Sequence, residues 1–503
     1  MKVDRIESIL QANPAVADVL VVDALPGSMR RAIAYIVPNE HYLNAMLETE
    51  DEQARLSRWR KVYDLFEKGR PGQSGPDGMK TNIWNSVYTN EPIPAEHMQE
   101  WCDLTIADIL SLHPSDVLEI GVGTGALLLM IAPHCKRYVG IDFSRASLDA
   151  TLREMKARNE DWNGVSLVER HADDLESFEN AGFDTVVINS VTQCFPSERY
   201  LNSVVSGAID AAAPNGSIFI GDVRSLPLLA LHAVSVELFH AQGDTDLSEL
   251  RERIRRRLRQ ERELVISPEY FLELQRRDQR IAEVAISPKR AGHDNEMTRF
   301  RYDVTLTLGK TAPAREHEWL DWTRARLSVE KLAAKLASES PATLGICSVP
   351  NSRLSQDLHA MRMISEMTGS FTVAELRAAL DAIPPTGVTA FEISRLASRM
   401  GYGIRFSWAR GADDASYDVF FDKSGENQGV VWPHRKDHQS GVNVLDPMRT
   451  AAGRRVRQEL IDALKRDLSA DDFDVDVILT HSLPKFAEGM TGASAFAGAI
   501  VPF

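Results

Sequence analysis

The chain has little cysteine and no long apolar segment. Its 503 residues include four cysteines, Cys102, Cys135, Cys194 and Cys347, which are far apart and form no CxxC pair. Reduced thiols in the cytoplasm fit this pattern, and no cluster of histidine, cysteine and carboxylate predicts a metal site. There is no run of 18 apolar residues and no signal-peptide core at the start. We therefore expect a cytoplasmic protein without a metal or a membrane span.

Basic charge is also scarce. The formal net charge is -15, whereas a general nucleic-acid binder needs a basic face to contact phosphates, so we expect no nucleic-acid partner. One local basic run, RERIRRRLRQER at 251–262, stands out. We interpret it as a solvated helix face, with a docking face for an acidic partner as the alternative.

The length and the order of apolar segments indicate several domains. A chain of 503 residues is too long for one ordinary core, and the stretch 70–80, with three glycines and two prolines, predicts a linker. Between 84 and 309 strand patterns alternate with helix patterns, which favours a doubly wound, mostly parallel sheet. We predict strands at 116–120, 138–142, 165–170, 184–189, 217–222, 282–286 and 301–308, and helices at 95–112, 125–133, 145–159 and 198–213.

The flanks carry different patterns. Residues 1–40 predict a helix and two strands around a Pro26-Gly27 turn, a fragment too small to fold without pairing to distant chain. We predict a charged helical stretch at 41–70, a cap at 243–263, helices at 313–365 and 373–402, short strands within 404–443, a helix at 453–468 and a strand at 473–479.

The most informative segment is VLEIGVGTG at 117–125. An apolar strand ends at an acid, and glycines follow at alternate positions, where backbone must turn or lie against a ligand. A second short strand ends at Asp142, whose carboxylate is placed to accept both hydroxyls of a ribose. The segment therefore predicts a nucleoside site.

The same segment favours one nucleoside. A nicotinamide fingerprint, G-x-G-x-x-G, holds a pyrophosphate, but Glu119 in E-x-G-x-G-x-G would repel one. Glu119 would instead favour a ligand with a cationic amino-acid end, such as S-adenosyl-L-methionine (SAM). A nicotinamide oxidoreductase is therefore disfavoured.

Several further motifs are similar to those of the methyltransferase domains that interrupt adenylation domains of nonribosomal peptide synthetases. They are WNSVYT at 84–89 with EPIP at 91–94, VINSV at 187–191 with FPS at 195–197, GDVRSLPL at 221–228 and NEMTRFRYDV at 295–304. The flanking IE at 6–7 and NPAV at 13–16 resemble the start of an adenylation-domain C-terminal subdomain. Its lysine-bearing closing motif has no match at 476–485.

The resemblance implies an α/β architecture. We expect a Rossmann-like class I SAM-dependent methyltransferase with a small split α+β adenylation-type subdomain and a helical region. The implied division is 1–45 for the first part of the subdomain, 46–80 for a helical linker, 81–312 for the methyltransferase domain, 313–410 for the helical region, and 411–503 for the rest of the subdomain and a tail.

The motifs and the resemblance together nominate cofactor-binding residues. The glycines would lie along the methionine part of SAM, Phe143 and Ser144 would flank the adenine, and Asp173 would accept the adenine amino group, unless Asp173 is a helix N-cap. The full set is Glu119, Gly121, Gly123, Gly125, Asp142, Phe143, Ser144, Asp173, Asp174, Asn189, Ser190 and Gln193. The product would be S-adenosyl-L-homocysteine.

Methyl transfer is an in-line displacement, so the acceptor must be aligned and water excluded. We nominate Tyr88, Asn189, Glu296, Arg224 and Asp222 as catalytic residues. Glu296 is the best base candidate, although Glu296 and Arg224 could instead form a salt bridge, and Asp222 could instead shape a turn.

The resemblance implies that the substrate is an aminoacyl group on the phosphopantetheine arm of a carrier protein or synthetase module, methylated on nitrogen. O- or C-methylation of a tethered or free molecule and a non-catalytic scaffold in a synthetase are the alternatives. The sequence leaves open the substrate side chain, the acceptor atom, whether the carrier is in cis or in trans, the oligomeric state and the role of 489–503.

Overall fold

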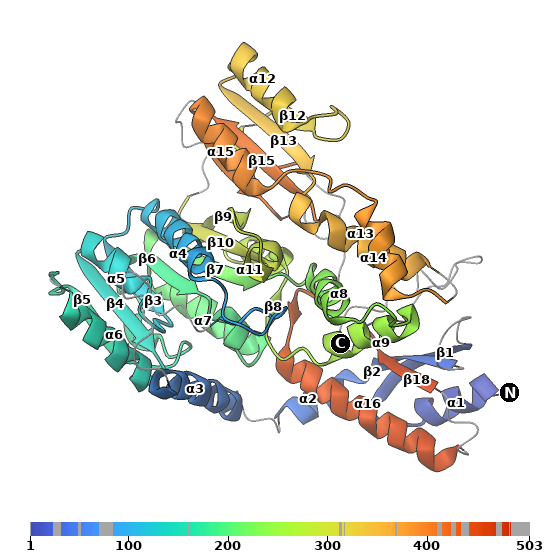
Figure 1. Ribbon diagram of the computed structural model, residues 1–503. Helices are drawn as coiled ribbons and strands as arrows, with labels where there is room; N and C mark the ends of the chain where they lie inside the picture. The colour runs from blue at the N-terminus through green and yellow to red at the C-terminus, as the bar shows by residue number, and fades with distance from the viewer. Residues whose placement is uncertain are drawn as a thin grey trace.

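Three sheets organise the computed structural model, together with helices that pack on them (Figure 1). A seven-stranded sheet lies at the left of the view, a four-stranded sheet at the top and a three-stranded sheet beside the N-terminus. Among the residues described, no helix combines the length and apolarity needed to span a bilayer. The described residues are 2–23, 32–48, 52–69, 84–158, 160–310, 314–315, 317–367, 370–409, 415–423, 429–433, 442–468, 475–481 and 483.

The largest sheet has the strand order β5-β4-β3-β6-β7-β10-β9. The first five of these strands are parallel, whereas β10 pairs antiparallel with β7 and β9 antiparallel with β10. The central strands are almost wholly buried, as expected where helices cover both faces. The predicted doubly wound sheet is confirmed, with β3 (Asp116–Ile120), β4 (Arg137–Asp142), β5 (Val165–Glu169), β6 (Phe183–Asn189), β7 (Ala212–Arg224), β9 (Ile281–Pro288) and β10 (Arg301–Leu308).

Helices follow the parallel strands in the predicted order. Ser144 and Ser197 begin two of them, and each serine hydroxyl accepts a backbone N–H three residues later. The helix predicted at 125–133 is shorter, because Gly125 is in a left-handed conformation and 125–127 form a turn. The helices are α4 (Ala95–Leu110), α5 (Leu128–Ile131), α6 (Arg145–Ala157) and α7 (Glu198–Ala211).

A helical insertion separates β7 from β9. It comprises α8 (Leu229–His240), α9 (Leu247–Arg259), β8 (Val265–Ile266) and α10 (Pro268–Arg277), whereas α11 (Glu296–Phe300) lies between β9 and β10. The basic run forms most of α9, whose apolar side chains are buried. Its arginines have partners within the chain: Arg253 and Arg257 bind Glu237, and Arg251 donates to the carbonyl oxygen of Ile364. Several arginines of the basic run are therefore already engaged by partners within the fold.

The strands found within 313–402, which we expect to be helical, are a correction, whereas the short strands predicted within 404–443 are confirmed. The helices α12 (Val329–Glu339), α13 (Ser352–Glu366), α14 (Val373–Asp381) and α15 (Ala390–Met400) are present. However, β12 (Trp319–Asp321), β13 (Thr343–Val349), β15 (Tyr417–Asp422) and β14 (Gly403–Ser407) form a sheet in that order. The boundary predicted at 410 separates β15 from its partner strands. Two-residue strands β11 (Ala314–Arg315) and β16 (Gly429–Val430) pair beside it.

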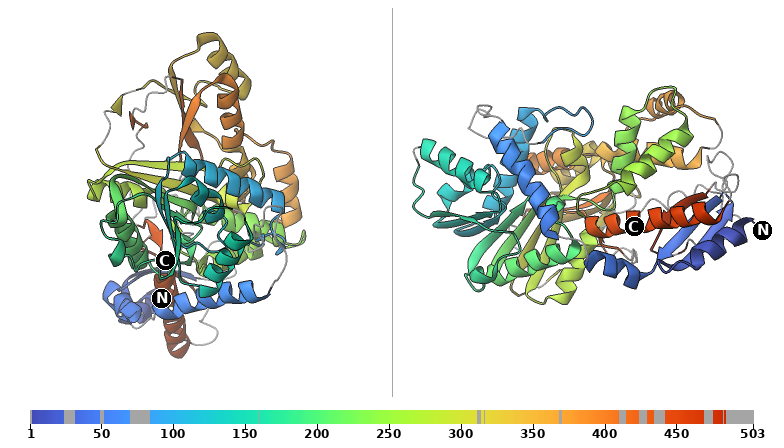
Figure 2. Two further views of the ribbon diagram at one scale, coloured as in Figure 1. Left: turned by 90° about the vertical axis from the view of Figure 1, so that its left-hand side faces the viewer. Right: turned by 90° about the horizontal axis from the view of Figure 1, so that it is seen from below.

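The three-stranded sheet joins the two ends of the described chain. The N-terminal strands β1 (Val16–Asp23) and β2 (Ala32–Pro38) form an antiparallel pair, and β18 (Val475–Leu479) adds to β2 in parallel. The prediction that the N-terminal fragment pairs with distant chain is confirmed; the Pro26-Gly27 turn, the loop 70–80 and the tail 489–503 lie outside the described residues. Buried side chains of α1 (Lys2–Gln11), α2 (Glu40–Glu48) and α16 (Pro447–Asp467) share its core. Figure 2 shows α16 running alongside these strands.

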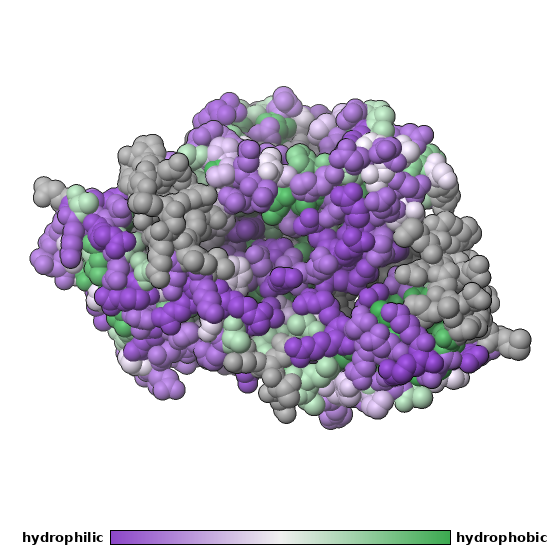
Figure 3. Space-filling model, turned by 60° about the horizontal axis from the view of Figure 1, so that its bottom comes forward, coloured by the Kyte–Doolittle hydropathy of each residue, from purple (hydrophilic) through white to green (hydrophobic). Residues whose placement is uncertain are grey.

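One helix links this small sheet to the large one. Helix α3 (Glu52–Gly69) lies against α6, where Asp64 accepts a hydrogen bond from the Ser144 hydroxyl at 2.8 Å and Arg60 pairs with Glu169 (Figure 1). At the start of α3, Glu52 pairs with Arg199 of α7. The face in Figure 3 is largely hydrophilic, with hydrophobic residues in small separate patches. Lastly, β17 (Val444–Leu445) pairs with β8.

Candidate active site

The glycine segment forms a tight loop after β3. Gly121, Gly123 and Gly125 all have positive φ, which disfavours any residue with a Cβ. At Gly121 a Cβ would also lie 2.5 Å from a Val191 methyl, and at Gly125 it would lie 2.6 Å from Thr151. Gly123 has open space on that side, so a ligand can approach its backbone closely.

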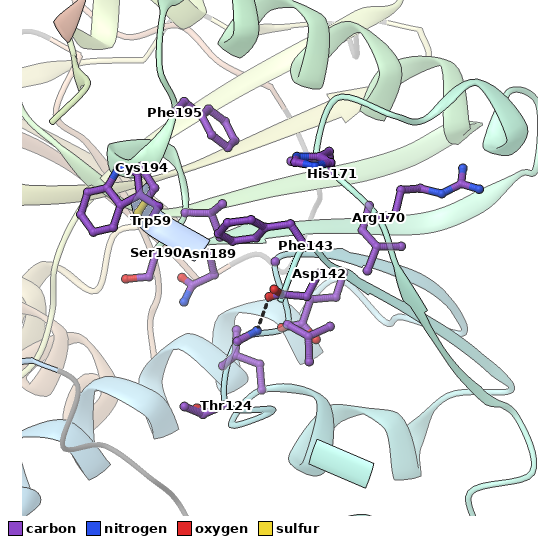
Figure 4. Close-up of a pocket in the computed structure, with 18 of the residues that line it drawn as sticks. Trp59, Thr124, Asp142, Phe143, Arg170, His171, Asn189, Ser190, Cys194 and Phe195 are labelled. Carbon is purple, nitrogen blue, oxygen red and sulfur yellow. Dashed lines mark hydrogen bonds between the residues drawn. The ribbon is translucent and has the colours of Figure 1, made fainter. Parts of the chain in front are cut away.

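Asp142, at the end of β4, organises this loop. One carboxylate oxygen accepts the Gly123 N–H at 2.8 Å, and the other accepts the Ser144 N–H at 2.8 Å (Figure 4). The side chain is buried, and burial raises the pKa of Asp142 while the two backbone hydrogen bonds lower it. Each oxygen has a second lone pair, so the carboxylate can accept ligand hydroxyls while still holding the loop.

Glu119 lies one strand away with its carboxyl group buried. It is 2% exposed, and it accepts a hydrogen bond from the Tyr138 hydroxyl at 2.9 Å. Burial raises the pKa of Glu119 to about 8, and the nearby Asp142 raises it further while Tyr138 opposes the shift. A cationic ligand group placed beside it would favour the ionised form.

Both carboxyl groups face one pocket of about 1010 Å³, including its open mouth. Figure 4 shows Asp142, Phe143, Asn189 and Ser190 around it. Of the nominated residues, those that line it are Glu119, Gly121, Gly123, Asp142, Phe143, Asn189 and Ser190.

Asn189 and Ser190 end β6 at the edge of the pocket. Asn189 is 8% exposed, and its side-chain oxygen has no hydrogen-bond partner among the described residues. Gly221, its neighbour on β7, leaves it room, because a Cβ there would lie 2.1 Å from that oxygen. Ser190 has a φ of 57°, and its carbonyl oxygen accepts a hydrogen bond from the Gln193 amide at 2.7 Å. Gln193 thus supports the turn from outside the pocket lining.

Asp222 lies directly behind Ser190 in a buried charge network. Its carboxylate accepts hydrogen bonds from the Ser190 hydroxyl and from Arg301, both at 2.5 Å, and Lys289 lies 3.8 Å away. Although burial would raise the pKa of Asp222, the two cations lower it. Lys289 also bonds Asp303 at 2.7 Å. Asp222 is therefore held ionised as a support for the Ser190 turn rather than as a free base.

The remaining cofactor candidates lie around the pocket rim. Ser144 is fully buried as the N-cap of α6. Asp173 forms a hydrogen bond with Tyr200, which itself lines the pocket, whereas Asp174 is exposed and lies 3.7 Å from Arg170. These residues can shape the adenine end without all contacting a ligand.

Tyr88 and Glu296 are connected through the segment that follows Trp84, which lines the pocket. The Glu296 carboxylate accepts the Val87 N–H at 2.8 Å, so it holds the segment that carries Tyr88. The Tyr88 hydroxyl lies 3.0 Å from the Ser235 hydroxyl of α8. Neither residue is among those that line the pocket.

Arg224 points away from the pocket into a buried salt bridge. Its guanidinium lies 2.8 Å from Glu261 and 2.7 Å from Glu263. Burial would raise the pKa of Glu261, but Arg224 lowers it to about 2. The alternative for Arg224, a salt bridge that holds the insertion after β7, is the arrangement found here.

Several pocket residues were not predicted. Leu56 and Trp59 come from α3, which we interpreted as a linker, and Trp101 comes from α4. Arg170 and His171 follow β5, and the His171 ring lies 6.1 Å from that of Phe143. Position immediately after a parallel strand was a usable signal for Arg170 and His171, but no sequence signal marked Trp59.

Comparisons with known proteins agree with this site. Residues 118–218 match a family described as a methyltransferase domain. The chain is 33% identical over 495 residues to chondramide synthase cmdD of Chondromyces crocatus, covering 92% of this chain and 12% of that protein. It is 26% identical over 509 residues to nonribosomal peptide synthetase dtxS1 of Metarhizium robertsii, covering 99% of this chain and 6% of that protein.

Solved structures include the N-methyltransferase NodS of Bradyrhizobium japonicum WM9 in complex with S-adenosyl-L-homocysteine. That structure is 16% identical, with a TM-score of 0.30, and covers 49% of this chain and 98% of NodS.

The glycine loop, the carboxylate of Asp142 and the matched domain define a SAM-dependent methyltransferase of class I. Over 92% and 99% of its length, the chain is similar to a segment of each of the two synthetases. It spans 12% or less of the length of the two synthetases compared here.

Proposed function

We propose that the protein N-methylates an aminoacyl group tethered to the phosphopantetheine arm of a carrier protein. The buried side-chain oxygen of Asn189, without a hydrogen-bond partner among the described residues, carries this proposal. An unpaired buried acceptor is costly unless a ligand donor satisfies it. An amine N–H of the substrate is a suitable donor. The synthetase relatives supply the context in which such an amine is tethered.

The residues present fit SAM. Gly123 leaves open space for close backbone approach, and the Asp142 carboxylate retains free lone pairs for the ribose hydroxyls. Glu119 would balance the ammonium group of the ligand, and Phe143 would lie against the adenine. When bound, SAM supplies an electrophilic methyl group on a positively charged sulfur.

The distribution of charged groups favours an amine acceptor. The acceptor nitrogen forms a bond to the methyl carbon as the carbon–sulfur bond breaks, the electron pair stays on sulfur, and the product ammonium loses a proton to water. An unprotonated amine needs orientation more than a base, whereas a hydroxyl or carbon acid needs proton removal. Among the described residues lining the pocket, the carboxyl groups are Glu119 and Asp142, and both serve SAM in this scheme.

O- or C-methylation is the second candidate function. Glu296 is the carboxylate nominated as the base, and it is 7% exposed. However, both of its oxygens already accept hydrogen bonds, from Val87 N–H at 2.8 Å and from the Ser86 hydroxyl at 3.4 Å. Glu296 would have to give up or share these contacts to take a proton from an acceptor, which favours the amine.

The test is to incubate the purified chain with methyl-labelled SAM and either carrier-bound aminoacyl groups or free amino acids, and to locate the label by mass spectrometry. We expect label on the amine of the tethered group. The variant Asn189→Ala should bind SAM but transfer the methyl at least about tenfold more slowly. Asn163→Ala, at an exposed asparagine after α6, is the matched control. Label on oxygen, carbon or a free molecule would refute the substrate assignment.

The other parts of the chain fit a role in the synthetase. We propose that the unit of β1, β2 and β18 is a remnant of the adenylation C-terminal subdomain around the methyltransferase domain at 81–312. Because the arginines of α9 already bind Glu237 and backbone carbonyls, the basic run 251–262 is a poor docking face for an acidic carrier protein.

A further inference from the structure

Two exposed hydrophobic side chains lie beside Tyr88. Of the large hydrophobic side chains in the described part of the chain, Val87 and Phe239 are the exposed ones, at 40% and 55%. The Phe239 ring lies 5.3 Å from the Tyr88 ring, and the His240 ring nitrogen lies 3.0 Å from the Val87 carbonyl oxygen. Tyr88 is half-buried under this pair, with Trp84 of the same segment reaching the SAM pocket.

Behind Tyr88, a chain of polar groups leads into the protein. The Tyr88 hydroxyl lies 3.0 Å from the Ser235 hydroxyl, and Ser235 forms a hydrogen bond with the carboxyl group of Asp357. Asp357 is 8% exposed and lies on α13, outside the seven-stranded sheet and its helices. Asp357 of α13 is therefore linked through Ser235 of α8 to the Tyr88 hydroxyl.

We infer that Ser235 and Asp357 are positioning residues that orient the Tyr88 hydroxyl toward the acceptor amine. This inference rests on the proposed function and on the nomination of Tyr88 as a catalytic residue. A carboxylate can only accept a hydrogen bond, so an ionised Asp357 accepts from the Ser235 hydroxyl. Ser235 then accepts from Tyr88, and the lone pairs of the phenol oxygen are left to accept an amine N–H. The nitrogen lone pair is thereby directed at the methyl group.

Protonation of Asp357 would allow the hydrogen bonds of this chain to reverse their direction. A protonated carboxyl group can donate to Ser235, after which Tyr88 can donate to the amine and occupy its lone pair. Burial raises the pKa of Asp357 to about 6, while Arg299 and Ser235 lower it and Asp294 raises it. Arg299 lies 3.5 Å from Asp357 and binds Asp294 more closely, at 2.7 Å. Tyr88 also faces the charges of Glu296 and Arg299.

The first test needs no turnover. With 3-fluorotyrosine at position 88, the 19F chemical shift should titrate with an inflection near pH 6, set by Asp357. The inflection should disappear in Asp357→Asn and in Ser235→Ala. It should persist in Asp294→Asn, the matched control that removes the other carboxylate bound to Arg299. A flat wild-type shift between pH 5 and 7 would overturn the inference.

The second test is a double-mutant cycle on methyl transfer at saturating SAM. Asp357→Asn should lower kcat by about tenfold in the wild-type background and by less than about twofold in a Tyr88→Phe background. The affinity for SAM should not change. Equal losses in both backgrounds would assign Asp357 a merely structural role. If no tethered amine is methylated while the 19F inflection behaves as expected, the proposed function fails but the coupling of Asp357 to Tyr88 stands.

Discussion

The ionisation of Glu119 should make the affinity for SAM depend on pH. In the ligand-free protein its pKa is about 8, mainly because the carboxyl group is buried. The ammonium group of SAM, with a pKa near 7.8, would pair with the carboxylate form. Binding therefore requires an ionised Glu119 and a protonated ligand, so the affinity should peak near pH 8.

The size of the effect follows from these two ionisations. The competent pair makes up about 20% of the mixture at pH 8 and about 1% at pH 6, so the affinity should fall about 20-fold between them. At pH 7 most Glu119 side chains carry a proton in the free protein, and binding should release about 0.8 proton per SAM. The isosteric variant Glu119→Gln keeps an acceptor for the Tyr138 hydroxyl but cannot ionise.

Isothermal titration calorimetry in two buffers of different ionisation enthalpy measures the affinity for SAM and the number of protons released on binding. Glu119→Gln should bind more weakly at pH 8, without the acid limb and without proton release. The Glu119 carboxyl group also affects folding. Between about pH 4.5 and 8 the folded state holds a proton on Glu119 that the unfolded state has lost. The stability contributed by this group is therefore lost as the pH rises through that window. Relative to wild type, Glu119→Gln should gain thermal stability from pH 6 to 8. An identical acid limb in both proteins would refute the reasoning.

Three further changes probe other parts of the site. Gly221→Ala would drive a Cβ to 2.1 Å from the Asn189 side-chain oxygen, so kcat measured with saturating SAM should fall at least about tenfold. Trp59→Ala removes a pocket wall supplied by α3 and should weaken SAM binding by about tenfold in calorimetry; unchanged affinity would exclude Trp59 from the site. Arg224→Ala leaves Glu261 buried without its cation and should cost about 3 kcal/mol in urea unfolding, with SAM affinity retained once the protein is folded.

The part of the site that is contiguous in sequence could be predicted. Gly121, Gly123 and Gly125 predict a ligand loop because their backbone conformation disfavours other residues, and Asp142 follows at the end of the next strand. The parallel sheet followed from the same alternation of strands and helices. These features depend on local physical constraints that a single sequence displays.

The parts that depend on tertiary partners could not be predicted in this way. Arg224 and Asp222 lie in one conspicuous motif, but their roles depend on partners 37 and 79 residues away. The strand β12 has three residues, and β13 lies between helices, so neither presented a periodicity long enough to separate it from its surroundings. No sequence pattern indicated which surface the charged helix α3 covers.

The placement of α3 has a consequence for how the parts of the protein cooperate. Its residues Leu56 and Trp59 form a wall of the SAM pocket, while Asp64 bonds the Ser144 hydroxyl at the N-terminus of α6. The same helix follows α2, whose Leu43 is buried in the core of the three-stranded sheet. A ligand that contacts Trp59 would therefore stabilise α3 against α6, and this binding energy would restrict the motion of the small sheet relative to the large one. Any movement of the small sheet that pulled α3 from α6 would, by the same linkage, weaken SAM binding.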